Sequence, residues 1–159
     1  MSLQLVVLDT GPLGLVTHPK PSPDAKACLA WLQHLLDQDV RVLVPAIADY
    51  ELRREYLLRR NTISLRKLDL LSEAGLFLPL SGEALHHAAQ LWAQTRQAGR
   101  PTSDAKALDG DCILVAQVQL EAARLELEES EWMIATTDVG DIPHLAPAKL
   151  WSEIQIEKF

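Results

Sequence analysis

Short apolar runs that stop at a turn signal recur along this chain and predict the strands of a sheet. They cover residues 3–8, 40–45, 76–80 and 132–137. Leu, Val and Ile dominate them, and two are followed directly by an aspartate, as is typical of buried parallel strands that end at a turn. A last short strand is expected after Leu145, where Pro147 weakens the pattern.

Between these runs, apolar residues recur every three or four positions, which predicts amphipathic helices. The expected helices cover residues 23–37, 46–60, 62–75, 82–99 and 111–125. Residues 9–12 (DTGP) are expected to form a turn after the first strand. Strands that alternate with helices predict an α/β fold with a parallel sheet and right-handed crossovers.

The length and composition bound what the chain can be. Its 159 residues, of which 48% are hydrophobic and 23% charged, suit one globular domain that covers residues 1–159. No basic segment with a long apolar run opens the chain, and no stretch approaches the roughly 20 apolar residues that span a bilayer. We therefore expect a cytoplasmic protein outside the membrane, with Cys28 and Cys112 as buried small hydrophobic residues.

The net charge of -7 argues against a basic shell that holds nucleic acid by electrostatics alone. Residues 53–67 form a local exception, with six basic residues against one acid. This basic run is either a surface that follows phosphates or a solvated helix face with pairs such as Glu55 and Arg59. Arg54 stands out because it follows Glu51 by three residues and is expected to reach a carboxylate or a substrate phosphate. The basic residues are Arg53, Arg54, Arg59, Arg60, Arg66 and Lys67.

Acidic residues stand where an open parallel sheet would place a site. Asp9 and Asp138 directly follow strands, and ligands of such sheets bind outside the carboxyl ends of the strands. Glu51 lies near the start of the helix after the second strand, and its spacing sets it beside an apolar stripe. That stripe consists of Ile47, Tyr50, Leu57 and Leu58.

Asp111 is expected to open the apolar helix at 111–125, where it would cap the helix or join the other acids. Four carboxylates in one pocket repel one another unless some are protonated or a divalent cation neutralises them. Oxygen ligands suit Mg²⁺ or Mn²⁺, ions that also take phosphate oxygens. Hydrolysis of phosphodiester bonds is therefore the reaction that this acid set predicts.

Four segments carry a resemblance to a known family: VVLDTGPL, PAIADYELRREYL, ALDGDCILVAQ and IATTDVGDI follow the order and spacing of the acidic motifs of PIN-domain nucleases. The resemblance covers almost the whole chain. It implies a three-layer α/β/α sandwich around a mostly parallel sheet of four or five strands, with Mg²⁺ or Mn²⁺ as cofactor and RNA as substrate. It also implies a homodimer, and the toxin half of a type II toxin-antitoxin pair with an antitoxin protein as partner. The matching residues are Asp9 with Thr10, Glu51, Asp111, and Thr136 with Asp138.

The resemblance leaves some roles open. Of three crowded acids it makes Asp111 the ligand, with Asp109 as a helix N-cap and Asp104 as a loop acid or a further contact to metal. Asp141 matches an acid that often orients metal-bound water in the family and is a further candidate contact to metal, although Ile142 replaces the usual aromatic residue. Thr10 and Thr136 are expected either to satisfy turn backbone or to hold a water on the metal.

Two other functions compete with a metal-dependent ribonuclease. A phosphatase or phospho-receiver would use Asp9 as an aspartyl nucleophile, but such sites usually carry a second Asp two residues later, where this chain has Gly11. A catalytically degenerate PIN-like module would bind RNA or a protein without cutting. The complete acid set argues against the module.

Overall fold

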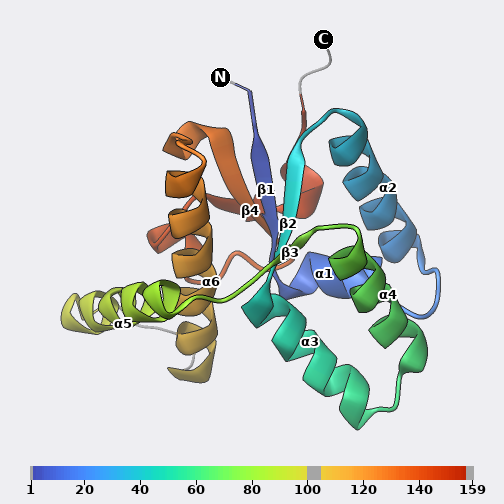
Figure 1. Ribbon diagram of the computed structural model, residues 1–159, viewed down its shortest axis with the longest axis horizontal. Helices are drawn as coiled ribbons and strands as arrows, with labels where there is room; N and C mark the ends of the chain where they lie inside the picture. The colour runs from blue at the N-terminus through green and yellow to red at the C-terminus, as the bar shows by residue number, and fades with distance from the viewer. Residues whose placement is uncertain (1, 100–104, 157–159) are drawn as a thin grey trace.

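Five parallel strands form one sheet in the order β3-β2-β1-β4-β5, with helices on both faces (Figure 1). The structure is a computed structural model that describes residues 2–99 and 105–156, without the side chains of 105 and 106. The strands are β1 Leu5–Leu8, β2 Arg41–Pro45, β3 Phe77–Leu78, β4 Trp132–Thr136 and β5 Ala148–Leu150. The helices are α1 Thr10–Val16, α2 Pro23–Asp37, α3 Ala46–Leu58, α4 Thr62–Glu73, α5 Gly82–Gln97 and α6 Ala105–Arg124. The expected sheet and its alternation with helices are confirmed.

The central strand β1 is buried on both faces, which explains its continuous apolar sequence. Leu5 and Val7 pack into a core beneath α5 and α6, while Val6 and Leu8 pack into a second core beneath α1 and α2. The sheet thus forms the middle of three layers, as Figure 1 shows. None of the described helices combines the length and the hydropathy that crossing a membrane requires. Cys28 and Cys112 are buried, as expected.

The segment after β1 is a helix, α1, where the sequence analysis expected only a turn. Asp9 caps its N-terminus, because its side chain accepts a hydrogen bond from the Thr10 N–H at 2.8 Å. Pro12 lies in the first turn, a position where a missing N–H costs no helical hydrogen bond. An aspartate followed closely by proline is itself a helix-start signal, so this expectation was wrong for a recognisable reason.

Asp111 does not open its helix, because α6 begins at Ala105 and places Asp111 in its second turn. Leu108, Cys112 and Val115 are buried at helical spacing, so the apolar stripe starts before the predicted boundary. Gly110 also lies inside the helix. Asp109 is therefore not the N-cap of this helix.

Most of the apolar stripe predicted on α3 does not face the core, although its first member, Ile47, packs against it. Tyr50, Leu57 and Leu58 are 59%, 59% and 78% exposed. The helix packs through the neighbouring positions Ala48, Leu52 and Tyr56 instead. Figure 1 shows why the other face stays in solvent: α3 runs away from the end of β2, and α4 returns beside it. Only the first turns of α3 lie near the sheet and α6.

Candidate active site

The carboxyl ends of β1 and β4 meet at the centre of the sheet, where the chain crosses to different faces. Asp9 follows β1 and Thr136 ends β4, and the Thr136 hydroxyl donates to Asp9 Oδ2 at 2.9 Å. Asp9 Oδ1 accepts from the Thr10 N–H. Both oxygens of this carboxylate are therefore held in place by neighbouring donors.

Glu51 reaches the same edge from α3. Thr10 Oγ1 donates to Glu51 Oε2 at 3.0 Å, which links α3 to the start of α1. On its other side Glu51 approaches α6 so closely that a Cβ atom added at Gly110 would lie 2.6 Å from Glu51 Oε1. The absence of a side chain at Gly110 makes room for Glu51 beside the backbone that carries Asp111.

Asp111 shows that the acids of distant segments converge. Its pKa rises from 3.8 to about 7, chiefly because burial penalises the charged form and then because four other carboxylates lie nearby. These carboxylates belong to Asp9, Asp141, Glu51 and Asp138. Burial also raises the pKa of Asp9, aided by the charge of Asp138, although hydrogen bonds from Thr10 and Thr136 act in the opposite direction. We refer to Asp9, Glu51, Asp111, Asp138 and Asp141 as the carboxylate cluster.

The carboxylate cluster is not a finished coordination sphere. Among the described residues, no three Asp, Glu, His or Cys side chains lie close enough together to hold one metal ion. Asp138 is exposed, and its Oδ1 accepts from the Gly140 N–H in the loop after β4. Unneutralised carboxylates repel one another, which explains why these side chains lie in one region although no three of them are close enough to bind the same ion.

The structure gives the remaining site residues different surroundings. Arg54, which was expected to reach a carboxylate or a substrate phosphate, is exposed, and its guanidinium lies 5.2 Å from the centre of the Tyr50 ring. Asp104 lies outside the described residues. Thr10 and Thr136 do more than satisfy turn backbone, since their hydroxyls bind the carboxylates of Glu51 and Asp9.

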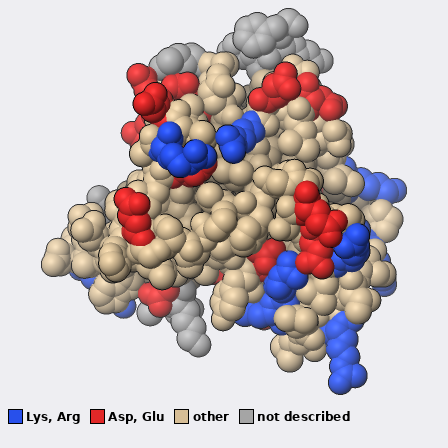
Figure 2. Space-filling view, viewed as in Figure 1, with Lys and Arg blue, Asp and Glu red and all other residues tan. Residues whose placement is uncertain are grey.

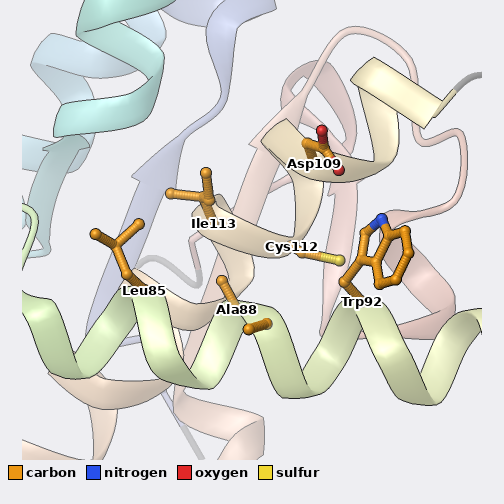
Figure 3. Close-up of a pocket in the computed structure, with 7 residues that line it drawn as sticks. Leu85, Ala88, Trp92, Asp109, Cys112 and Ile113 are labelled. Carbon is orange, nitrogen blue, oxygen red and sulfur yellow. The ribbon is translucent and has the colours of Figure 1, made fainter.

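Asp109 points away from the carboxylate cluster, as expected for a residue two positions before Asp111 on a helix. It lines a pocket of about 360 Å³ between α5 and α6, together with Leu85, Trp92 and Cys112 (Figure 3). Most of this pocket is apolar, and Asp109 is the one charged side chain among the described residues that line it. Asp109 is thus separated from the other acids by the body of α6.

Three of the six basic residues in the run 53–67 have an acidic partner among the described residues, so the run is not a continuous phosphate-binding surface. Arg53 donates to Asp49 at 2.8 Å and to Asp69 at 3.0 Å, and Asp49 is only 7% exposed. Arg66 pairs with Glu73. Figure 2 shows acidic and basic side chains side by side over α3 and α4. The expected pair of Glu55 and Arg59 is present but loose, at 3.9 Å.

The sequence analysis placed Gly11 in a turn and Thr137 where a strand ends in a turn, and it missed the close approach between them. A Cβ at Gly11 would lie 2.8 Å from Thr137 Cβ and closer still to its hydroxyl oxygen. The start of α1 therefore lies directly against the residue between Thr136 and Asp138. A glycine two positions after a candidate ligand was the sequence signal for this close approach.

We predict that Gly11→Ala destabilises the protein by about 1–3 kcal/mol, because Thr137 or the start of α1 must move. The midpoint of thermal unfolding should fall by roughly 3–8 °C, measured by circular dichroism. Gly82→Ala is the matched control, since nothing lies within 4 Å of a Cβ there. Equal melting temperatures for the two variants would show that the contact is not tight.

Comparisons with known proteins bear on the fold. No family model matches the sequence, and no curated protein matches it. The structure superposes on a chain of VapBC2 from Rickettsia felis bound to a DNA fragment from their promoter, with a TM-score of 0.66, 13% identity and coverage of 92% of this chain and 98% of that one. A chain of VapBC-1 from nontypeable Haemophilus influenzae gives a TM-score of 0.60, 16% identity and coverage of 94% and 99%. The chain therefore has the α/β/α fold that the PIN-domain resemblance implied.

Proposed function

We propose that this chain is a divalent-metal-dependent ribonuclease of the PIN-domain type that acts in the cytosol. The observation that carries the proposal is the meeting of four segments at one edge of the sheet. Thr136 holds Asp9, Thr10 holds Glu51, and Glu51 lies against Gly110 next to Asp111. This arrangement of acids supports hydrolysis of a phosphodiester bond without a side-chain nucleophile.

The donor set fits a hard divalent cation such as Mg²⁺ or Mn²⁺. The carboxylate cluster offers oxygen ligands only, and its mutual repulsion is relieved when a cation replaces a proton on Asp111. Asp9, Glu51, Asp111 and Asp138 would hold the ion, and at least one of them must turn to do so. When bound, the ion supplies Lewis-acid activation of water and neutralises phosphate charge.

The protein's own groups would prepare the site. Thr136 and Thr10 fix one carboxylate each, so that these ligands pay little entropy on binding the ion. Asp141 lies close enough to act on Asp111 through its charge and would help to orient the attacking water. Arg54 would contact the substrate from α3.

The toxin role is part of the proposal. Two chains of similar fold come from VapBC structures, which supports an antitoxin partner and a toxin function for this chain. A homodimer, expected from the family resemblance, is likewise proposed. The toxin role would require an antitoxin protein that masks the carboxylate cluster or binds near it.

A PIN-like module that binds RNA or protein without cutting is the second candidate. The exposure of Asp138 favours it, together with the lack of any three ligands close enough for an ion among the described residues. The two functions differ in one measurable property, which is cleavage that depends on a divalent ion.

We predict that the purified protein cleaves an RNA pool with Mn²⁺ or Mg²⁺ and that a chelator stops the reaction. Asp9→Asn should lower the rate about 100-fold, because the carboxylate at the centre of the sheet edge is lost. Asp24→Asn, at an exposed position in the first turn of α2, is the matched control and should keep full activity. In cells, expression of the wild type should arrest growth and Asp9→Asn should not.

The alternatives give different results in this experiment. A preparation that binds Mn²⁺ and RNA but releases no fragments would support the binding module. Cleavage that survives both the chelator and Asp9→Asn would mean that a contaminant or another site is responsible, and the proposal would be rejected.

A further inference from the structure

The outward face of α3 carries an aromatic and cationic pair beside the carboxylate cluster. Tyr50 immediately precedes Glu51 in the chain, and Arg54 follows one turn later. Tyr50 is 59% exposed, although a tyrosine usually buries much of its ring. The Arg54 guanidinium lies over this ring at 5.2 Å, and this contact helps to order both side chains.

Arg54 differs from Arg53, the other arginine of α3, in having its charge available. Arg53 is bound by Asp49 and Asp69, and Arg59 pairs with Glu55. Arg54 takes part in none of the ion pairs found among the described residues. A guanidinium that stacks on an aromatic ring keeps its edge N–H groups free for phosphate oxygens. The charge of Arg54 is therefore available to a polyanion.

We propose that Tyr50 and Arg54 form a stacking platform for a nucleobase of single-stranded RNA, next to the phosphodiester bond that would be cleaved at the carboxylate cluster. This inference rests on the proposed ribonuclease function. Single-stranded RNA is recognised by bases stacked on aromatic rings and on guanidinium planes, combined with backbone contacts. The Tyr50–Arg54 platform supplies both kinds of contact within one turn of helix.

The position of the platform suits a substrate that must reach an acidic site. A carboxylate cluster repels RNA until a cation is bound, so binding needs an attractive contact outside the cluster. Glu51 links the two features, because its carboxylate lies in the cluster while its neighbour Tyr50 faces solvent. A base held on the platform would place the adjoining phosphate near the start of α3, beside Glu51.

Charge complementarity favours RNA over a protein as the occupant of this face. Arg54 lies on α3, and Arg59 and Arg60 follow its C-terminal end, in a protein whose net charge is -7. Leu57 and Leu58 extend the face with apolar surface, which is the feature that a protein partner would use. The test must therefore separate dependence on bases from dependence on apolar contact.

The experiment measures binding and cleavage of a short single-stranded RNA of about eight nucleotides. Tyr50→Ala should weaken binding about tenfold in the presence of chelator, because base stacking on an aromatic ring is lost. In the presence of Mn²⁺ the same variant should raise KM by a similar factor and leave kcat nearly unchanged. Tyr50→Phe keeps the ring and should behave as the wild type does. Leu29→Ala, an exposed apolar residue on α2, is the remote control.

A second arm tests whether a base occupies the platform. A series of the same RNA with one abasic nucleotide moved along the strand should contain one position that weakens binding to the wild type about tenfold. An abasic nucleotide at that position should not weaken binding to Tyr50→Ala any further, since removing the base and removing the ring abolish the same interaction.

The outcomes separate this inference from the function on which it rests. If the wild type cleaves RNA but Tyr50→Ala binds and cleaves equally well, the platform is wrong and the ribonuclease remains. If no RNA is cut with any divalent ion, both proposals are rejected. If Tyr50→Ala and Leu57→Ala bind RNA as the wild type does but no longer bind a protein partner, this face is a protein interface and the inference is overturned.

Discussion

Asp111→Asn is expected to remove cleavage and, at the same time, to stabilise the metal-free protein. The rate of RNA cleavage should fall by about 100- to 1000-fold, because Asp111 is the carboxylate on which the other acids converge. Without metal, however, the ionised carboxylate of Asp111 destabilises the folded protein. Burial and four like charges raise its pKa to about 7, so ionising it above that pH costs free energy.

The sign of the pH dependence follows from this raised pKa. Between pH 4 and pH 7 the unfolded chain has released the Asp111 proton and the folded protein has kept it, so the free energy of unfolding falls as the pH rises. A move from 3.8 to about 7 corresponds to an upper limit of about 4 kcal/mol. Asp111 is partly exposed, and solvent screening reduces this to about 1–2 kcal/mol.

Thermal or urea unfolding between pH 5 and pH 8, in chelator, measures this effect. The metal-free wild type should be less stable at pH 8 than at pH 5, and Asp111→Asn should be more stable than the wild type at pH 8. Some slope of the same sign should remain in the variant, because the pKa of Asp9 is also raised. The pKa of Glu121 is lowered, so the stability that this residue contributes is lost only below about pH 4.5, outside the range of this experiment.

Adding Mn²⁺ supplies the control for this prediction. A cation that binds the folded protein should stabilise the wild type most at high pH, where Asp111 is ionised, and the asparagine variant much less. A metal-free wild type with the same stability at pH 5 and pH 8 would show that Asp111 is not in this environment. The claim that Asp111 supports cleavage while it destabilises the metal-free fold would then be wrong.

The strand ends were the part of the site that could be predicted from sequence. Asp9 and Asp138 follow strands whose apolar runs are continuous, and parallel strands bring their carboxyl ends to one edge. The structure places Asp9 beside Thr136 at the end of β4, as this logic requires. The location of the acids therefore follows from periodicity and topology.

Helix starts and helix faces could not be predicted with the same success. The apolar residues of α3 populate two neighbouring stripes, and only packing against α1 and α4 decides that Ala48, Leu52 and Tyr56 face inward. The helix expected at residues 111–125 begins at Ala105 instead, and Gly110, although glycine is a poor helix former, lies inside it beside Glu51. In both cases a tertiary contact outweighed the local preference.

The basic run illustrates the same limit for charges. Its six positive residues are close in sequence, but Arg53 turns toward Asp49 and Asp69, and Arg66 toward Glu73. The acids that pair with them lie outside residues 53–67, and one of these pairs, between Arg53 and Asp69, forms only when α3 and α4 have packed together. Net charge along a segment thus overstates the charge that a ligand would meet.

Gly110→Ala is expected to lower cleavage about 100-fold while the fold keeps or gains stability. The added Cβ would lie 2.6 Å from Glu51 Oε1, so the carboxylate must leave its present position, and a displacement of about 1 Å at a reacting centre costs a factor of this size. The fold should tolerate the change, because the atom that must move is the end of a flexible side chain. Alanine in a helix interior is favoured over glycine by up to about 1 kcal/mol.

Two comparisons isolate the contact between Gly110 and Glu51. Gly14→Ala makes the same substitution in α1, where the nearest atom is Leu52 Cδ2 at 3.7 Å, and should leave cleavage unchanged. Glu51→Asp shortens the side chain, so adding Gly110→Ala to that variant should cost little further activity, and the two effects should be far from additive. Equal losses of activity with Asp or Glu at position 51 would mean that alanine acts through the backbone of α6 and therefore through Asp111. Full activity of Gly110→Ala would place the working position of Glu51 away from α6, and Glu51 could then not share an ion with Asp111.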